Sequence, residues 1–309
     1  MNPDLPARSQ RDPGGGHPAR LAVGVIGAGR AGTALGAALA RAGHDVVAAS
    51  AVSDASVQRA RAAFPGAVIT DPGQVLRRAD LALLTVPDDV LPGLVAGLAA
   101  TEAPLEGRLL VHASGRHGLA VLDPAARRGG LPIALHPVMT FAGRGDDVDR
   151  LSGTCFGVTA PEALRPAAEA LVIEMGGEPV FIAEEHRDLY HAALAGAANH
   201  LITLVTEAQD LLRAAGVNDP ARLLGPLLSA SLDNALRLGD AGLTGPVARG
   251  DAETVAAHVA ALEAEPSASP AAVAAYLAMA RLTADRALAA GLLKPADAER
   301  LLGVLGGRR

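Results

Sequence analysis

The spacing of apolar and polar residues differs between the two halves of the chain. In the first half, short apolar runs typical of buried strands alternate with segments whose apolar residues recur at helical spacing, whereas only helical spacing remains in the second half. We therefore expect a parallel α/β domain over residues 21–183 and an all-helical domain over residues 184–309. Beyond a strand–turn–helix–strand unit at 21–50, the expected strands are 67–70, 80–86, 108–112, 132–136, 154–159 and 179–182, and the late helices are 185–215, 220–238, 251–263, 270–290 and one from 295.

A glycine turn links the first expected strand to the first helix. It reads Gly27-x-Gly29-x-x-Gly32, the spacing in which the first glycine permits a tight turn, the second admits a pyrophosphate and the third lets helix and strand pack closely. Strand, turn and helix together predict a Rossmann dinucleotide-binding domain. The residues expected to contact the cofactor are Gly27, Ala28, Gly29, Arg30, Ala31, Gly32, Ser50, Ser53, Val86 and Pro87.

The end of the second strand bears on the choice of cofactor. An Asp or Glu there usually bonds the ribose 2′-hydroxyl of NAD, and this chain has Ser50 instead. A neutral hydroxyl does not repel a 2′-phosphate, and Arg30 and Ser53 can supply charge and hydrogen bonds to it. We therefore favour NADP(H) over NAD(H). The alternative is that Asp54 reaches the ribose, although an Asp before a helical run is more often its N-cap.

Composition excludes several classes of protein. The 309 residues are half hydrophobic, carry a net charge of -6 and are 2% aromatic, so neither nucleic acid nor a membrane is an expected partner. The lone Cys155 excludes an internal disulfide and a multi-cysteine metal site, so we expect no metal, a buried apolar role for Cys155 and a cytoplasmic location. Residues 1–20 have the composition of a disordered tail and lack the apolar stretch of a signal peptide.

Candidate catalytic residues follow the expected strands, because ligands of open parallel sheets bind at the carboxyl ends. Ser114 lies in a polar turn after one strand, and His136 stands before Pro137 at the end of the next. The imidazole is a natural proton donor near neutral pH, with a buried structural histidine as the alternative. Because Lys294 is the only lysine, and it stands in an expected helix connection, we do not expect a lysine to supply the proton. His44, His117 and His186 are expected in exposed segments.

The first long helix of the second half carries a second group of candidates. His191 and Asn199 are eight residues apart, which places them within roughly 80° of each other on a regular helix, with small residues between them. Either a substrate and nicotinamide face this helix, or another helix packs closely against it. Further on, Arg249 can bind a substrate carboxylate as a bidentate fork, or form a surface ion pair of little consequence.

The chain resembles Rossmann-like proteins with a C-terminal domain of unknown function, number 2520. The motifs that carry the resemblance are GAGRAG at 27–32, LLTVPDD at 83–89, HASG at 112–115, LHPVMTF at 135–141, YHAALAGAANH at 190–200 and LTGPVARGD at 243–251. These proteins are related to ketopantoate reductase, pyrroline-5-carboxylate reductase and hydroxyisobutyrate dehydrogenase. The resemblance implies a helical domain similar to that of 6-phosphogluconate dehydrogenase, and an NADP(H)-linked reduction of a small keto acid, such as ketopantoate, or of an imine.

The resemblance departs from ketopantoate reductases at their catalytic helix, Lys-x-x-x-Asn-x-x-x-Asn. When the second Asn is aligned with Asn199, the lysine falls on His191 and the first Asn on Ala195. Prephenate dehydrogenases use a serine and a His-Pro pair, to which Ser114 and His136-Pro137 are similar. We therefore expect a 2-keto acid held between Ser114, His136, Asn199 and Arg249, with His136 or His191 as the proton donor.

Two other functions are compatible with the sequence. The chain could be a non-catalytic regulator that binds NADP(H), for which the missing lysine is the best argument, or an enzyme of the prephenate dehydrogenase type. The Ala-rich apolar helices of the second half would suit a homodimer.

Overall fold

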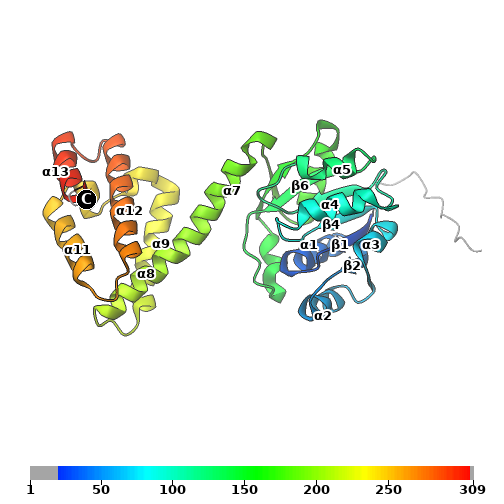
Figure 1. Ribbon diagram of the computed structural model, residues 1–309, viewed down its shortest axis with the longest axis horizontal. Helices are drawn as coiled ribbons and strands as arrows, with labels where there is room; N and C mark the ends of the chain where they lie inside the picture. The colour runs from blue at the N-terminus through cyan, green and yellow to red at the C-terminus, as the bar shows by residue number, and fades with distance from the viewer. Residues whose placement is uncertain (1–19, 307–309) are drawn as a thin grey trace, which may run out of the picture. The chain divides into compact units, whose positions relative to one another are not determined.

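The computed structural model describes residues 20–306 and divides into two compact units, one up to Ala195 and one from Gly196 (Figure 1). The expected tail at residues 1–20 lies outside the described residues except for Arg20. The strands are β1 (Ala22–Ile26), β2 (Asp45–Ser50), β3 (Val68–Ile69), β4 (Leu81–Leu84), β5 (Leu109–His112), β6 (Leu131–Pro137), β7 (Cys155–Thr159) and β8 (Glu178–Phe181). Within the described residues they form one eight-stranded sheet in the order β3-β2-β1-β4-β5-β6-β7-β8.

The helices of the first unit connect these strands. They are α1 (Arg30–Arg41), α2 (Asp54–Ala63), α3 (Pro72–Arg78), α4 (Leu91–Ala100), α5 (Asp123–Ala126), α6 (Arg165–Glu174) and α7 (Arg187–Ala195). Local hydrogen bonds explain where two of them begin: Asp71 Oδ1 accepts the Gln74 N–H at the start of α3, and Ser53 Oγ accepts the Ser56 N–H at the start of α2. The N-cap of α2 is therefore Ser53, and Asp54, which the sequence suggested for that role, is its first helical residue.

Both faces of the sheet are buried, each by its own hydrophobic cluster. In β4, Leu81 and Leu83 belong to the cluster that includes residues of α1 and α6, whereas Ala82 and Leu84 belong to the cluster that includes residues of α3 and α4. This alternation follows from the two-residue period of a strand. The two-sided burial confirms the expected α/β fold and leaves polar side chains to the ends of the strands.

The direction of β7 differs from the all-parallel expectation. Strands β1 to β6 pair in parallel, but β7 runs antiparallel to β6, with His136 opposite Gly157. The connection 138–154 between β6 and β7 contains 3₁₀ turns but no α-helix, so it lacks the crossover helix that usually joins parallel neighbours. As a result, the carboxyl end of β6 lies beside the first residues of β7.

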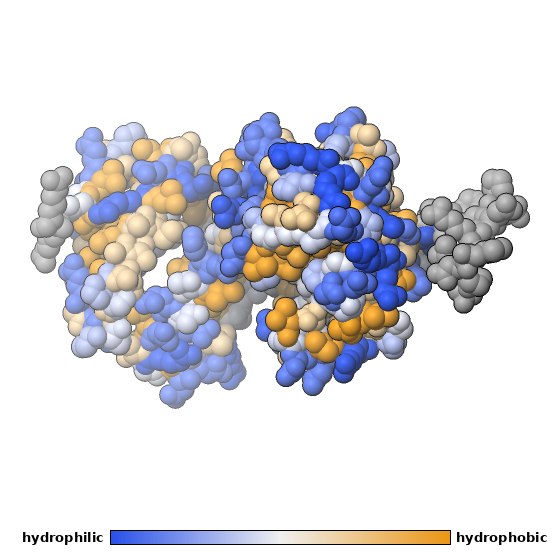
Figure 2. Space-filling view, turned by 45° about the vertical axis from the view of Figure 1, so that its right-hand side comes forward, coloured by the Kyte–Doolittle hydropathy of each residue, from blue (hydrophilic) through white to orange (hydrophobic). Residues whose placement is uncertain are grey.

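The second unit is helical throughout its described residues. After a π-helical turn at Gly196–His200 come α8 (Leu201–Ala214), α9 (Pro220–Leu238), α10 (Pro246–Arg249), α11 (Ala252–Ala264), α12 (Pro270–Ala289) and α13 (Pro295–Gly306). The buried residues of its core all come from the segment 247–305. Helices α8 and α9 instead expose large apolar side chains, including Ile202, Leu227 and Leu236, and Figure 2 shows apolar residues at the surface of this unit.

Two expectations about burial were wrong. Cys155 is exposed because it is the first residue of β7, at the end of the sheet. His44 is buried, since its Nδ1 accepts the Leu21 N–H and its Nε2 lies 2.9 Å from Glu174 Oε2. A turn residue can thus be buried when its side chain bonds neighbouring segments.

Helix α6 offers a matched test of this core. Leu171 is 4% exposed within the cluster beneath α1 and α6, whereas Ile173 on the same helix is 58% exposed. Leu171→Ala should lower the free energy of unfolding by about 2–5 kcal/mol, because it removes buried contacts and leaves a cavity. Ile173→Ala should change it by less than about 1 kcal/mol. Urea unfolding of both variants measures the difference, and equal losses would contradict this packing.

Candidate active site

The glycine turn between β1 and α1 is held closed by β2 and by the residue after β4. The N–H groups of Gly27 and Ala28 donate to the Ser50 carbonyl, and Thr85 Oγ1 donates to the Gly27 carbonyl at 2.9 Å. A Cβ on Gly27, where φ is +93°, would lie 2.9 Å from the Thr85 backbone, and a Cβ on Gly32 would lie 2.5 Å from the Gly27 oxygen. The fold itself therefore requires these two glycines.

Gly29 is different, because the nearest atom to a Cβ built there is 3.9 Å away. Nothing in the described chain demands a glycine at this position. Gly29 is also the N-cap of α1, where no side chain caps the helix and no acidic residue occupies its first turn. Open space above an uncapped helix N-terminus fits a dinucleotide pyrophosphate held by backbone N–H groups.

The residues expected around a 2′-phosphate lie in different settings. The Ser50 hydroxyl is buried and accepts the Gly27 N–H at 3.3 Å, and Ser53 Oγ caps α2. Arg30 is exposed and packs along Gly143, whose Cβ would lie 3.0 Å from Arg30 Cγ. On the other side of the turn, Val86 Cγ1 would lie 2.9 Å from a Cβ on Gly27, and Pro87 follows Val86. Ser50, Arg30 and Val86 thus lie at the turn, whereas Ser53 caps α2, and both serines have partners in the protein.

His112, which is fully buried, holds the loop after β5 in place through hydrogen bonds. Its Nε2 lies 2.8 Å from the Gly118 carbonyl, and its Nδ1 accepts the Ser114 N–H. Burial lowers the pKa of His112 to about 4, so the ring is neutral with both nitrogens engaged. Ser114 is buried as well, and its Oγ accepts the His117 N–H at 3.0 Å. Both polar side chains of this turn therefore stabilise the loop.

Two histidines and a tyrosine gather where β6 ends. His136 Nδ1 lies 2.8 Å from the Tyr190 hydroxyl, and the ring centroids of His136 and His191 are 6.2 Å apart. Gly115 lies between the two imidazoles: a Cβ there would be 2.8 Å from His136 Nε2 and 2.7 Å from His191 Cδ2. Helix α7 thus brings two side chains to the residue that the sequence singled out at the end of β6.

Arg187, at the start of α7, is buried beside this group. Its Nε donates to Thr159 Oγ1 at 2.8 Å, and its terminal nitrogens donate to the carbonyls of Gly115, Ala134 and Gly157. No carboxylate forms an ion pair with it within residues 20–306. The direct hydrogen-bond partners of the guanidinium are therefore uncharged, although the Glu184 carboxylate also acts on its charge.

Burial and this charge set the protonation of the site. Burial lowers the pKa of His136 to about 4, the positive charges of Arg187 and His191 act in the same direction, and Asp88 opposes them. Burial raises the pKa of the Tyr190 hydroxyl. At neutral pH the pair is therefore a neutral imidazole and an un-ionised phenol.

Sequence reasoning missed Tyr190 and Arg187. Both belong to the helix that carries His191, and Tyr190 precedes it directly, but an arginine among 26 offers no signal of burial. Asn199 and Arg249 belong to the second unit, where Arg249 donates to the Thr244 carbonyl. The angle estimated between His191 and Asn199 assumed a regular α-helix, which residues 196–200 do not form.

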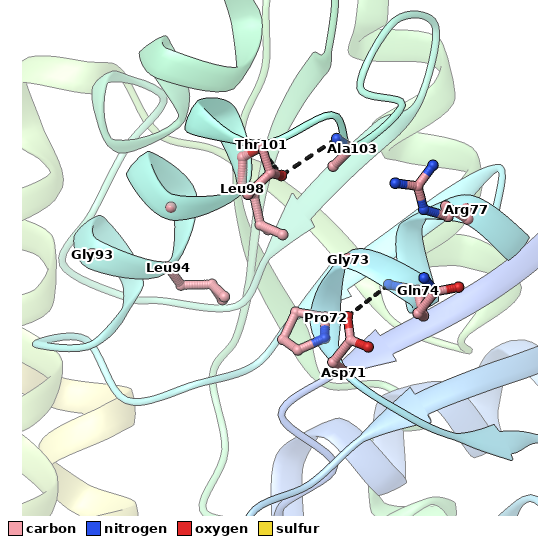
Figure 3. Close-up of a pocket in the computed structure, with 11 residues that line it drawn as sticks. Asp71, Pro72, Gly73, Gln74, Arg77, Gly93, Leu94, Leu98, Thr101 and Ala103 are labelled. Carbon is pink, nitrogen blue, oxygen red and sulfur yellow. Dashed lines mark hydrogen bonds between the residues drawn. The ribbon is translucent and has the colours of Figure 1, made fainter.

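A groove in the first unit lies apart from the candidate catalytic residues. It holds about 470 Å³ between α3 and α4, and Figure 3 shows apolar side chains such as Leu94 and Leu98 along it. Its dashed hydrogen bonds, from Gln74 N to Asp71 and from Ala103 N to Thr101, serve the ends of the helices. Among residues 20–306, no cluster of metal-ligating side chains occurs, and no helix there is long and apolar enough to cross a membrane.

The two lowered histidine pKa values predict an acid-sensitive fold. In the unfolded chain, His112 and His136 bind protons near pH 6.5, whereas in the fold they do so only near pH 4. The unfolded state therefore binds more protons in this window, and the free energy of unfolding should fall as pH drops from 7 to 4, by about 3 kcal/mol for each ring.

Urea unfolding at several pH values measures this slope. His136→Asn should reduce it, because one of the two rings is gone, whereas His186→Asn, on an exposed residue, should leave it unchanged. A slope that His136→Asn does not alter would contradict the assignment.

Comparisons with known proteins agree with this architecture. A Rossmann-like domain profile matches residues 7–137, and the profile of a domain of unknown function, DUF2520, matches residues 154–283. A glycerol-3-phosphate dehydrogenase [NAD(P)+] of a Bradyrhizobium species (strain BTAi1) is 28% identical over 230 residues, which are 71% of this chain and 68% of that enzyme.

Two solved structures share the fold at low sequence identity. A Bacteroides fragilis protein superposes with a TM-score of 0.69 at 21% identity, covering 86% of this chain and 98% of its own. An imine reductase from a Pseudomonas species superposes with a TM-score of 0.63 at 21% identity, covering 91% of this chain and 98% of its own. Residues 7–137 thus resemble a Rossmann-like domain, and residues 154–283 resemble a DUF2520 domain.

Proposed function

We propose that this protein is an NADP(H)-dependent oxidoreductase that reduces the C=O or C=N group of a small carboxylate compound, in the manner of a ketopantoate reductase. The observation that carries the proposal is the group of His136, Tyr190 and His191 at the end of β6, in the same unit as an uncapped glycine turn with open space at Gly29. The alignment with an NAD(P)+-dependent dehydrogenase supports the same class of enzyme.

The glycine turn would hold the cofactor. The backbone N–H groups at the start of α1 would bind the pyrophosphate, and Arg30, exposed beside the turn, would face the 2′-phosphate. NADPH supplies the hydride when it is bound. The protein must then hold the substrate and deliver a proton to it.

His136 would deliver that proton as a neutral group. Gly157 gives the Tyr190 oxygen a backbone hydrogen bond, and in this mechanism the Tyr190 hydroxyl donates to His136 Nδ1, which leaves the imidazole proton on Nε2. When Nε2–H protonates the substrate oxygen or nitrogen, Nδ1 can take the proton of Tyr190. The resulting negative charge lies on the phenolate, whose ring centroid is 5.7 Å from the Arg187 guanidinium carbon. His191, across Gly115, is the alternative donor.

The remaining parts of the proposal concern the second unit. Asn199 stays a predicted catalytic residue, and Arg249 stays the predicted contact of the substrate carboxylate. We also propose a homodimer, because the large apolar side chains that α8 and α9 expose have no buried core of their own in this unit.

Turnover tests the proposed reaction. The purified protein should consume NADPH saturably with one of three substrates: ketopantoate, a cyclic imine carboxylate or dihydroxyacetone phosphate, the oxidised partner of glycerol 3-phosphate. His136→Gln and His191→Gln identify the proton donor. The variant that lacks the donor should have a kcat lower by about 10²- to 10⁴-fold. His186→Gln, on an exposed ring, is the control.

Two results would count against this mechanism. If both variants kept kcat within a few-fold of the parent, neither histidine would be the donor. Tight NADPH binding without turnover of any carbonyl or imine would instead favour the non-catalytic regulator, a function with which the single lysine, Lys294, is also compatible.

Ser50 offers a separate test of cofactor choice. A carboxylate in Ser50→Asp can still accept the Gly27 N–H, but it would repel a 2′-phosphate and bond a 2′-hydroxyl. The variant should bind NADPH more weakly by tenfold or more, on the order of 1.4 kcal/mol, and NADH more tightly. Thr101→Asp, after α4 at the other end of the strands, adds the same charge as a control. A parent protein that bound NADH more tightly than NADPH would contradict the preference.

A further inference from the structure

The surroundings of Arg187 are unusual for a charged side chain. The residue is 2% exposed, and each of its bonding nitrogens finds an uncharged acceptor. The shortest bonds run from Nε to Thr159 Oγ1 at 2.8 Å and from Nη2 to the Gly157 carbonyl at 3.1 Å. Longer ones join Nη2 to Ala134 O and Nη1 to Gly115 O. Burying a charge without an ionic partner is costly, so a structural purpose alone would be served more cheaply by an apolar residue.

The acceptors share one property: each belongs to a segment that positions the candidate catalytic group. Ala134 precedes His136 by two residues on β6, and Gly157 lies opposite His136 on β7. Gly115 separates the rings of His136 and His191. One planar side chain thus fastens the three backbone segments that surround His136.

Tyr190 is fixed by the same arrangement. A Cβ on Gly157 would lie 2.3 Å from the Tyr190 hydroxyl oxygen, so the phenol is seated directly against the residue whose carbonyl Arg187 binds. The guanidinium also lies 5.7 Å from the Tyr190 ring centroid. Arg187 and Tyr190 are three residues apart on α7, one helical turn.

We propose that Arg187 is the positioning residue of this site: its fork holds β6, β7 and the 112–118 loop so that Tyr190 bonds His136 Nδ1. The role in catalysis rests on the proposed reductase function, whereas the hydrogen bond does not. A lysine could supply the charge but not the planar set of donors that reaches separate carbonyls.

The groups that face His136 agree with this role. Arg187, Tyr190 and His191 approach it from α7, and Asp88 acts on it from the loop after β4. Asp88 raises the pKa of His136, whereas Arg187 and His191 lower it. Removing Arg187 should therefore let His136 take up a proton at higher pH.

Imidazole ¹⁵N shifts measure both effects without cofactor or substrate. In the parent protein, His136, identified by the signal missing from His136→Gln, should carry its proton on Nε2 and stay neutral down to about pH 4. Arg187→Met should move its titration upward toward 6.5 and mix the two tautomers. Arg187→Lys should keep the low titration, because the charge remains, but should mix the tautomers.

Arg116→Met is the matched control. Arg116 lies next to Gly115 but is 62% exposed, where it pairs with Asp188 at 3.7 Å. The variant removes the same charge nearby and should leave both the tautomer and the titration of His136 as in the parent.

Kinetics add a readout for positioning. Arg187→Lys should lower kcat by about 10²-fold with little change in the KM for NADPH, because reacting groups misplaced by about 1 Å lose rate of that order. If Arg187→Met does not fold, as judged by its thermal transition, Arg187→Lys alone decides the positioning role.

One result would overturn the proposal: a single Nε2–H tautomer of His136 in Arg187→Lys or in a folded Arg187→Met. If the parent protein turns over no carbonyl or imine, the reductase function fails, and the ¹⁵N measurements still judge what Arg187 does to His136.

Discussion

Burial of both faces of the sheet is the constraint on which the rest of the first unit depends. Strand residues alternate between two apolar clusters, so a polar side chain within a strand would have to enter one of them. Polar chemistry is thereby confined to the ends of the strands, where the glycine turn, the 112–118 loop and His136 occur. The reversed β7 extends this edge, because its first residues lie beside the carboxyl end of β6.

Close approach of α7 to the sheet backbone is the second organising feature. Tyr190 packs against Gly157 and His191 packs against Gly115, where a larger residue would clash with them. Arg187 is buried beside these contacts. The three residues act on His136 in different ways, through a hydrogen bond, a ring contact and a charge. The proposed mechanism needs no lysine, because it assigns proton donation to a neutral histidine whose tautomer a neighbouring hydroxyl would fix.

The sequence sufficed for the fold because apolar periodicity and glycine spacing are local signals. The sequence also singled out His136, because it stands at the end of an expected strand, and His191, because it lies on a helix with small residues next to it. It could not show that His112, Ser114 and Ser50 have partners within the protein, since those partners are set by loop conformation. Nor could it show a buried Arg187, because its acceptors are backbone carbonyls, which every residue possesses. The exposed Cys155 and the antiparallel β7 likewise depend on which strands become neighbours.

The three glycines of the turn between β1 and α1 are required for different reasons, two by the fold and one by a ligand. Gly27 and Gly32 are demanded by the backbone and by Thr85, so a descendant of this protein that lost its cofactor would still need them in order to fold. A Cβ at Gly29 would meet no atom of the protein closer than 3.9 Å, so the selection for glycine at this position comes from a ligand. Substitution of Gly29 in related proteins would therefore indicate that the domain has kept its fold but no longer binds the ligand.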